Sequence, residues 1–141
     1  METPDVPASS ALRFRTRLAT RWSDEDNQQV LNNAVYLTLF EEARYRYFAA
    51  HLARNQFPFL LAQTNVLFVA PGRGGAEVEL ECGTTHVGTT SFTQAYRVRD
   101  AESGRVLCEG EARLVCYDAA SGAKRPIPDA VRAAITAREA G

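Results

Sequence analysis

The sequence predicts a single α+β domain in which a mostly antiparallel sheet of five strands wraps around one long helix. Three observations support this fold class. The length of 141 residues suits one hydrophobic core and leaves no room for a second. An apolar stripe at helical spacing runs through residues 34–54 without Gly or Pro. One alternating segment precedes this stretch, and further strand-like segments follow it at hairpin spacing.

The first strand is expected over residues 14–22, where arginines occupy alternate positions. Its inward face would carry Phe14, Thr16, Leu18, Thr20 and Trp22. After a polar segment come Asn32 and Asn33, and asparagine is a preferred residue just before the first helical turn. We therefore expect the long helix to begin at this pair.

The long helix should bury one stripe of its surface against the sheet. The expected stripe contains Leu37, Phe40, the stem of Arg44, Tyr47 or Phe48, and Leu52, widened by Tyr36, Ala43 and Ala50. Four strands should follow, over residues 60–70, 76–82, 92–99 and 106–117. A Pro-Gly segment, a bend and a hairpin turn separate them, and a short helix over residues 129–138 ends the chain.

Composition excludes several classes of protein. Lys and Arg total 16 and Asp and Glu total 17, so the formal net charge is −1, which argues against a nucleic-acid partner. The longest uncharged stretch, residues 56–72, contains prolines and polar amides, so no membrane span is expected.

The three cysteines form no C-x-x-C motif and are odd in number, which favours a reducing cytoplasm. Residues 1–12 have no signal-peptide features and are predicted to be a flexible tail on a domain of residues 13–141.

The densest polar feature is S-D-E-D-N-Q-Q at residues 23–29, between the first strand and the long helix. The amides of Asn33, Ala34 and Val35 should lack intrahelical partners, and the helix dipole adds partial positive charge there, which would stabilise an oxyanion. A carboxylate a few residues upstream would then be placed to act as nucleophile or general base. The alternative is that these acids only cap the helix and coat a loop.

Other chemistries fit the sequence less well. A calcium loop would need Gly at Gln29 and Glu at Val35, so no metal is assigned. There is no G-x-S-x-G motif for a serine nucleophile. His51 and His86 do not form a metal-ligand pair, and each is more simply a structural or surface residue.

Several short motifs occur in an order and spacing that resemble one enzyme family. They are Arg21-Trp22, S-D-E-D at 23–26, Asn32-Asn33-Ala34, E-E-A-R at 41–44, V-A-P-G-R-G-G at 69–75, V-G-T-T-S-F-T-Q at 87–94 and R-P-I-P at 125–128. With them, residues 13–135 resemble the hotdog-fold thioesterases, and most closely the 4-hydroxybenzoyl-CoA thioesterase-like branch. The derived order of elements matches a hotdog fold throughout.

The resemblance implies roles for individual residues. Asp26 matches the catalytic carboxylate, which acts as nucleophile or as base for water on the thioester carbonyl, and Asp24 matches an acid with a structural role. The backbone amide of Asn33 matches the oxyanion donor. The segment beside the pantetheine arm of coenzyme A corresponds to Val87, Gly88, Thr89, Thr90 and Ser91. No metal or cofactor is implied.

The sequence departs from the family in two places. Many relatives have Gly-His where this chain has Gln29-Val30, so no histidine assists from that position, and glutamine should alter the loop backbone. Some relatives also have a basic run before the turn serine, which would pair with the CoA phosphates. Here Arg73, Arg97, Arg99 or a partner subunit would have to replace it, or the carrier is a protein.

We therefore expect an acyl-CoA thioesterase that hydrolyses an aryl- or fatty acyl-CoA, or an acyl carrier protein thioester, to free acid and thiol. Two alternatives stay open. An enoyl-thioester hydratase or dehydratase usually pairs Asp with His on a helix, and no D-x-x-x-x-H pattern occurs near Asp26. A non-enzymatic acyl-CoA-binding protein that acts as a sensor would need a DNA-binding segment. An apolar pocket is expected, with Tyr36, Phe40, Phe68 and Phe92 as candidate walls.

An open five-stranded sheet leaves unpaired strand edges, which predicts pairing into a homodimer or homotetramer. The resemblance places the catalytic cleft between subunits. Asp26 of one chain would then face residues 87–91 of the other.

Overall fold

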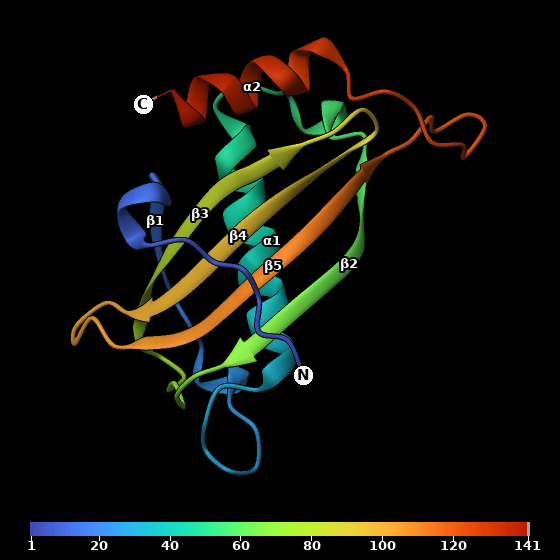
Figure 1. Ribbon diagram of the computed structural model, residues 1–141. Coiled ribbons are helices and arrows are strands. Elements are labelled where there is room, and N and C mark those ends of the chain that lie inside the picture. The colour runs from blue at the N-terminus through green and yellow to red at the C-terminus, as the bar shows by residue number, and fades with distance from the viewer. Residues whose placement is uncertain (141) are drawn as a thin grey trace.

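The computed structural model describes residues 1–140, which form five strands and two α-helices (Figure 1). The strands are β1 (Phe14–Ala19), β2 (Phe59–Phe68), β3 (Glu77–Val87), β4 (Ser91–Asp100) and β5 (Val106–Cys116), and the helices are α1 (Asn33–Ala49) and α2 (Asp129–Glu139). The order of elements is the one that the sequence predicts. No helix in this part of the chain has the length and apolar character needed to cross a membrane.

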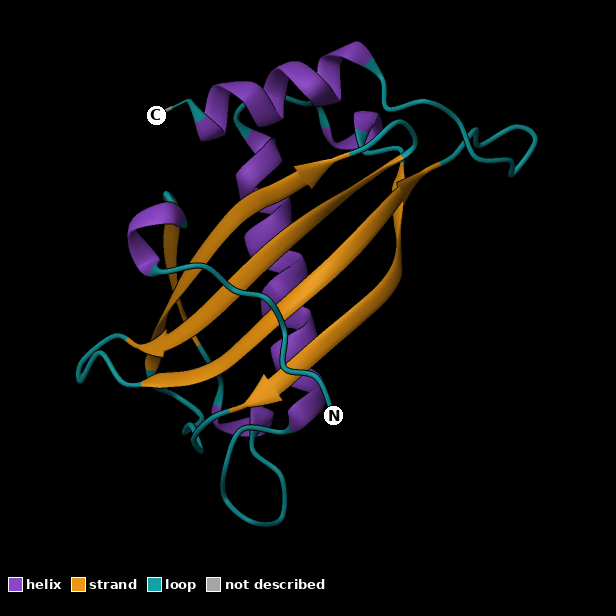
Figure 2. Cartoon of the chain, viewed as in Figure 1, coloured by secondary structure: helices purple, strands orange, loops and turns teal. Residues whose placement is uncertain are grey.

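The strands form one sheet in the order β1-β3-β4-β5-β2, and all four pairings are antiparallel. α1 lies along one face of this sheet, and α2 lies across the end of α1 (Figures 1 and 2). This arrangement confirms the predicted α+β architecture. It also leaves β1 and β2 as the two edge strands.

The residues that α1 buries differ in part from the predicted stripe. The helix buries Tyr36, Leu39, Phe40, Ala43, Tyr47 and Phe48. Leu37 and Ala50, which we placed on the stripe, are exposed, because Leu39 takes the inward position instead. The helix ends at Ala49, five residues earlier than expected from its pattern ending at residue 54. Arg138 of α2 caps this end, since its guanidinium Nε donates to the Tyr47 carbonyl oxygen at 2.8 Å.

β1 ends at Ala19, before the predicted end at residue 22, and Trp22 is 81% exposed rather than inward. Local capping explains the difference. The Arg21 amide donates to Asp24 Oδ2 at 2.8 Å, and its Nη2 donates to Asp24 Oδ1 at 2.8 Å. These bonds turn the chain into a short 3₁₀ turn, Trp22–Asp24, and override the alternation of the strand.

The inward faces of β3, β4 and β5 agree with the predicted alternation. They bury Val78, Leu80, Cys82, Phe92, Gln94, Tyr96, Val98, Cys108, Ala112, Leu114 and Cys116. Gly110 belongs to this face, and the ring of Phe40 occupies the space where its Cβ would stand. This close approach lets the Phe40 ring of α1 pack directly against the backbone of β5.

The outer face of the sheet carries a row of alternating charges. Arg15, Glu81, Arg97 and Glu109 stand opposite one another in register on β1, β3, β4 and β5. Arg97 Nη1 lies 3.1 Å from Glu81 Oε1, and Arg97 Nη2 lies 2.7 Å from Glu109 Oε2. Opposite charges in directly facing positions stabilise a sheet, so this row ties four strands together.

The N-terminal segment of residues 5–12 crosses this charged face, as the dark blue trace in Figure 1 shows. Ser9 Oγ donates to Glu81 at 2.8 Å, Arg97 donates to the Pro7 carbonyl oxygen at 2.9 Å, and Leu12 is fully buried. As a result Glu81 is completely removed from solvent. Part of the segment that we expected to be a flexible tail therefore packs against the domain.

Candidate active site

Backbone hydrogen bonds join the two sides of the loop between β1 and α1, residues 20–32. Glu25 and Leu31 form an isolated antiparallel bridge, and the Asp26 amide donates to the Val30 carbonyl oxygen at 2.9 Å. The Gln29 amide donates in turn to the Asp26 carbonyl oxygen at 3.0 Å. The backbone of Asp26 is therefore fixed by hydrogen bonds, and its side chain is half-buried.

The Asp26 carboxylate is oriented by one of its oxygens and open at the other. Oδ1 accepts a hydrogen bond from the Gln28 amide at 2.7 Å. Within residues 1–140, Oδ2 has no hydrogen-bond or ion-pair partner. A carboxylate fixed in this way keeps free lone pairs for attack on a carbonyl carbon or for removing a proton from water.

Gln29 has φ 61°, in the left-handed region where glycine is the favoured residue. This is the position at which many of the resembling thioesterases have Gly. Glutamine holds this left-handed conformation at a cost of about 1–2 kcal/mol. We expected glutamine to alter the loop backbone, and at this position the chain makes a left-handed turn.

Asp24 is engaged with Arg21 and is not free for chemistry. Hydrogen bonds from the Arg21 side chain and amide hold the pKa of Asp24 below its ordinary value. Its backbone carbonyl oxygen also accepts from the Asn32 amide at 2.9 Å. Asp24 thus ties the start of the loop to the start of α1, so that Asp26 lies between two fixed points.

The first turn of α1 leaves one amide available. Asn32 Oδ1 accepts from the Ala34 amide at 2.9 Å, and the Asn32 carbonyl oxygen accepts from the Val35 amide at 2.9 Å. Of the three amides that we expected to be free, only that of Asn33 has no acceptor in the described chain. It lies at the positive end of the helix dipole, where an anion is stabilised.

Residues 87–91 contain the turn between β3 and β4, which lies at the opposite end of the sheet from the loop between β1 and α1 and from the start of α1 (Figure 1). The Gly88 amide donates to the Ser91 carbonyl oxygen at 2.8 Å, and Arg132 of α2 donates to the Gly88 carbonyl oxygen at 2.6 Å. The turn is therefore well anchored. A single chain does not bring it to Asp26.

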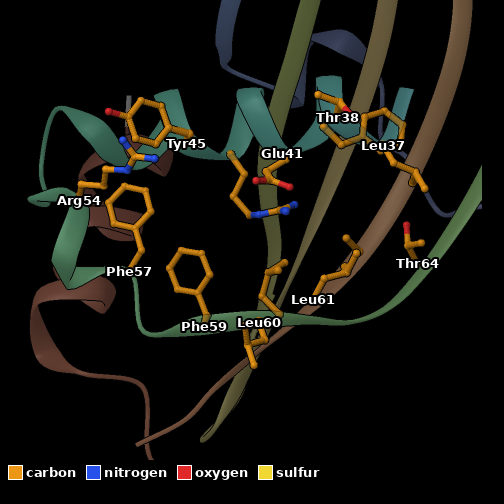
Figure 3. Close-up of a pocket in the computed structure, with 14 residues that line it drawn as sticks. Leu37, Thr38, Glu41, Tyr45, Arg54, Phe57, Phe59, Leu60, Leu61 and Thr64 are labelled. Carbon is orange, nitrogen blue, oxygen red and sulfur yellow. The ribbon is translucent and has the colours of Figure 1, made fainter. Parts of the chain in front are cut away.

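A pocket between α1 and β2 has a volume of about 470 Å³ (Figure 3). Its apolar walls include Leu37, Phe40, Phe57, Phe59, Leu60 and Leu61. Three charged side chains also line it, those of Glu41, Arg44 and Arg54. Figure 3 shows Arg54, Tyr45 and Phe57 gathered at one end of the pocket.

Only Phe40 among the four candidate walls lines this pocket. Tyr36 and Phe92 are buried in the core, and Phe68 is exposed at the edge strand. The Tyr36 hydroxyl has no hydrogen-bond partner in the described part of the chain. The charged members of the pocket were not predicted from the sequence, although the E-E-A-R motif contains two of them at residues 41 and 44.

Two of the arginines considered for CoA phosphates are already occupied. Arg97 pairs with Glu81 and Glu109, and Arg99 pairs with Glu81 at 3.2 Å. Arg73 is exposed and stays available. Among the residues described, no three His, Cys, Asp or Glu side chains are grouped closely enough to hold a metal ion.

Comparisons with known proteins identify the family and the fold. A family model of the thioesterase-like superfamily matches residues 20–135, whereas no curated protein matches the chain. A thioesterase from Thermus thermophilus, solved with coenzyme A and Zn, is 30% identical, with a TM-score of 0.81 over 90% of this chain and 94% of that chain. Slr0204, a 1,4-dihydroxy-2-naphthoyl-CoA thioesterase from Synechocystis, has the same fold at 22% identity, with a TM-score of 0.80 over 86% of this chain and 94% of that one. The chain therefore belongs to the thioesterase-like superfamily, with the hotdog fold, and is a thioester hydrolase.

Proposed function

We propose that the protein hydrolyses the thioester of an aryl- or fatty acyl-CoA, or of an acyl carrier protein, to the free acid and the thiol. The observation that carries this proposal is that the Asp26 carboxylate and the start of α1 belong to one hydrogen-bonded loop. One carboxylate oxygen is open, and the single available helix amide, that of Asn33, follows in the same tied loop. The coenzyme A bound to the Thermus thermophilus relative supports a CoA thioester as substrate.

In this mechanism the Asn33 amide donates a hydrogen bond to the thioester oxygen as negative charge develops there. Asp26 either attacks the carbonyl carbon, forming an anhydride and expelling the thiolate, or removes a proton from the attacking water. In the first route water then cleaves the anhydride, and in both routes the thiolate takes up a proton. Tyr36, within one turn of Asn33, is buried in the core and does not line the pocket, so we do not place it among the contacts of the acyl group.

We expect the site to be completed by a second copy of the chain. β2 contains no charged residue and exposes Leu60, Leu61, Leu67 and Phe68, whereas the other edge strand, β1, exposes arginines. Charged side chains protect an edge and apolar ones invite pairing, so β2 is the edge that fits a partner strand. An antiparallel pair of β2 strands reverses one chain relative to the other, which carries residues 87–91 of the partner toward the end that holds Asp26.

A lysine placed on the outer side of β2, away from the pocket, should dissociate this dimer. The variant Leu67→Lys is expected to have the mass of one chain by light scattering and to lose most of its activity, because the shared cleft is gone. Ala19→Lys, on the other edge strand, is the matched control and should keep both mass and activity. A wild-type mass of one chain throughout micromolar dilution, with full activity, would show that neither the dimer nor the shared cleft exists.

A panel of thioesters tests the activity itself. The purified protein should release thiol from aryl- and fatty acyl-CoA, and assays with the matching acyl carrier proteins identify the carrier. Conversion of crotonyl-CoA without thiol release would favour the hydratase alternative. Tight binding of acyl-CoA without any turnover would favour a non-enzymatic binding protein. The three cysteines are unpaired and buried, which suits the cytoplasmic location that we propose.

A further inference from the structure

Arg44 is a half-buried cation on the wall of the pocket beside α1. Its Nη1 donates to the Tyr96 hydroxyl at 2.9 Å, and its guanidinium carbon lies 6.0 Å from the centre of the Tyr96 ring. A guanidinium has five N–H donors, and this is the one hydrogen bond that Arg44 makes within residues 1–140. The remaining donors are available to a molecule in the pocket.

A buried chain of hydrogen bonds holds Arg44 in place. Tyr96 donates to Gln94 Oε1 at 2.7 Å, Gln94 Nε2 donates to Thr84 Oγ1 at 3.2 Å, and Thr84 Oγ1 donates to the Tyr47 hydroxyl at 2.9 Å. Tyr47 then donates to Glu139 Oε2 of α2 at 2.5 Å. All five hydrogen bonds, counted from Arg44, point in the same direction. Each residue donates to the next one, and the last acceptor is the Glu139 carboxylate on α2. Such chains strengthen their members and fix their orientation.

The charges around the pocket are not balanced. Arg44 and Arg54 contribute two cations, whereas Glu41 contributes the one carboxylate among the lining residues. No carboxylate of the described chain forms an ion pair with Arg44. A half-buried guanidinium is most stable beside an oxygen acceptor, and above all beside a carboxylate, which it can bind through two parallel N–H groups.

The position of Arg44 relative to Asn33 sets the length of a ligand that would reach both. The two residues are eleven positions apart on α1, about 16 Å along the axis. Helical side chains point back toward the start of the helix, so the guanidinium should lie on the order of 10 Å from the thioester carbonyl. A chain of about eight carbons spans this length while it contacts the apolar pocket walls.

We propose that Arg44 is a specificity-determining residue that recognises an acceptor oxygen at the far end of the acyl group. This inference rests on the proposed function, because it places the acyl group in this pocket and the thioester carbonyl at Asn33. The substrate class is then an acyl thioester of medium length with a terminal carboxylate or hydroxyl. Tyr96 acts as a positioning residue, since it touches Arg44 and not the substrate.

Matched substrates test the role of Arg44. The kcat/KM values of octanedioyl-CoA and 8-hydroxyoctanoyl-CoA are each divided by that of octanoyl-CoA. Both substrates carry an acceptor oxygen at the far end of the acyl group. The larger of the two ratios shows whether Arg44 prefers a carboxylate or a hydroxyl. We expect a ratio above one for the wild type and a fall of about 10- to 100-fold in Arg44→Gln, as for loss of a hydrogen bond to a charged group. Tyr96→Phe, which only frees the guanidinium, should lower the ratio less. Arg105→Gln, an exposed arginine on the β4–β5 turn, is the control and should leave the ratio unchanged.

Binding of the free acids separates this inference from the proposed function. Titration calorimetry should show tighter binding of octanedioate than of octanoate, with the difference lost in Arg44→Gln, whether or not any thioester is turned over. Absence of turnover with this difference present would overturn the hydrolysis alone. Equal binding of the two acids, or equal loss of all substrates together with dissociation of the dimer in Arg44→Gln, would overturn the role of Arg44. Arg44→Lys keeps the charge and replaces Arg44→Gln if that variant does not fold.

Discussion

Replacing Asp26 with asparagine is expected to lower kcat for acyl-CoA hydrolysis by about 10²- to 10⁴-fold, the usual contribution of a positioned acid or base. Asparagine keeps the size of the side chain and its Oδ1 still accepts from the Gln28 amide, so the loop should hold its shape. What it loses is the open, negatively charged oxygen. KM should therefore change little, which is the signature of an interaction made mainly in the transition state.

Asp118→Asn provides a matched control for this variant. Asp118 also accepts the amide two residues further on, that of Ala120, at 2.9 Å, but it lies in the exposed loop before α2. It should keep full activity. Full activity in Asp26→Asn, after contaminating esterases are removed, would falsify the assignment. Label in the Asp26 carboxylate after single turnovers in ¹⁸O-water would identify the nucleophilic route, in which water attacks the aspartyl carbonyl of the anhydride.

Replacing Glu81 with alanine is expected to reduce the free energy of unfolding by about 3–5 kcal/mol, the typical cost of removing one partner from a buried ionic group. Glu81 is fully buried and lies within 3.5 Å of arginine nitrogens on β1 and β4. Without Glu81, Arg97 and Arg99 would lose the carboxylate that they share, and their positive charges would be less well balanced beneath the N-terminal segment. Chemical denaturation of the wild type and the variant measures the difference.

The same carboxylate should make stability depend on pH. Burial alone would raise the pKa of Glu81, but hydrogen bonds from Ser9, Arg97 and Arg99 outweigh it and hold the pKa below its ordinary value. Because the folded pKa is the lower one, Glu81 stabilises the fold above the ordinary glutamate pKa near 4.5, and this is lost as pH falls through the folded pKa.

Glu77→Gln, on the same face of β3, is the control for both experiments. Glu77 pairs with Arg17 at the exposed end of the strand, so its loss should cost less than about 1 kcal/mol. If Glu81→Ala is no less stable than this control at pH 7, then the buried charge row does not hold the strands together.

The predictions that succeeded depend on patterns read within a single segment. Alternation over β3, β4 and β5 identified the inward residues because the period of a strand is two and a shift by one residue would expose all of them. Asn32 marked the start of α1 because a cap is made by the chain itself. The acidic loop before it was recognisable as a candidate site for the same reason, since strand, loop and helix are continuous in sequence.

The remaining features depend on contacts between distant parts of the chain, which only the tertiary structure decided. The burial of Leu39 in place of Leu37 follows from how α1 is turned against the sheet. The cover over Glu81 comes from Ser9, 72 residues away in sequence. Arg44 becomes a member of the pocket because Tyr96, 52 residues further on, holds its guanidinium. Helix and strand periodicity constrain which face of an element is apolar, but packing against other elements determines which polar side chains meet.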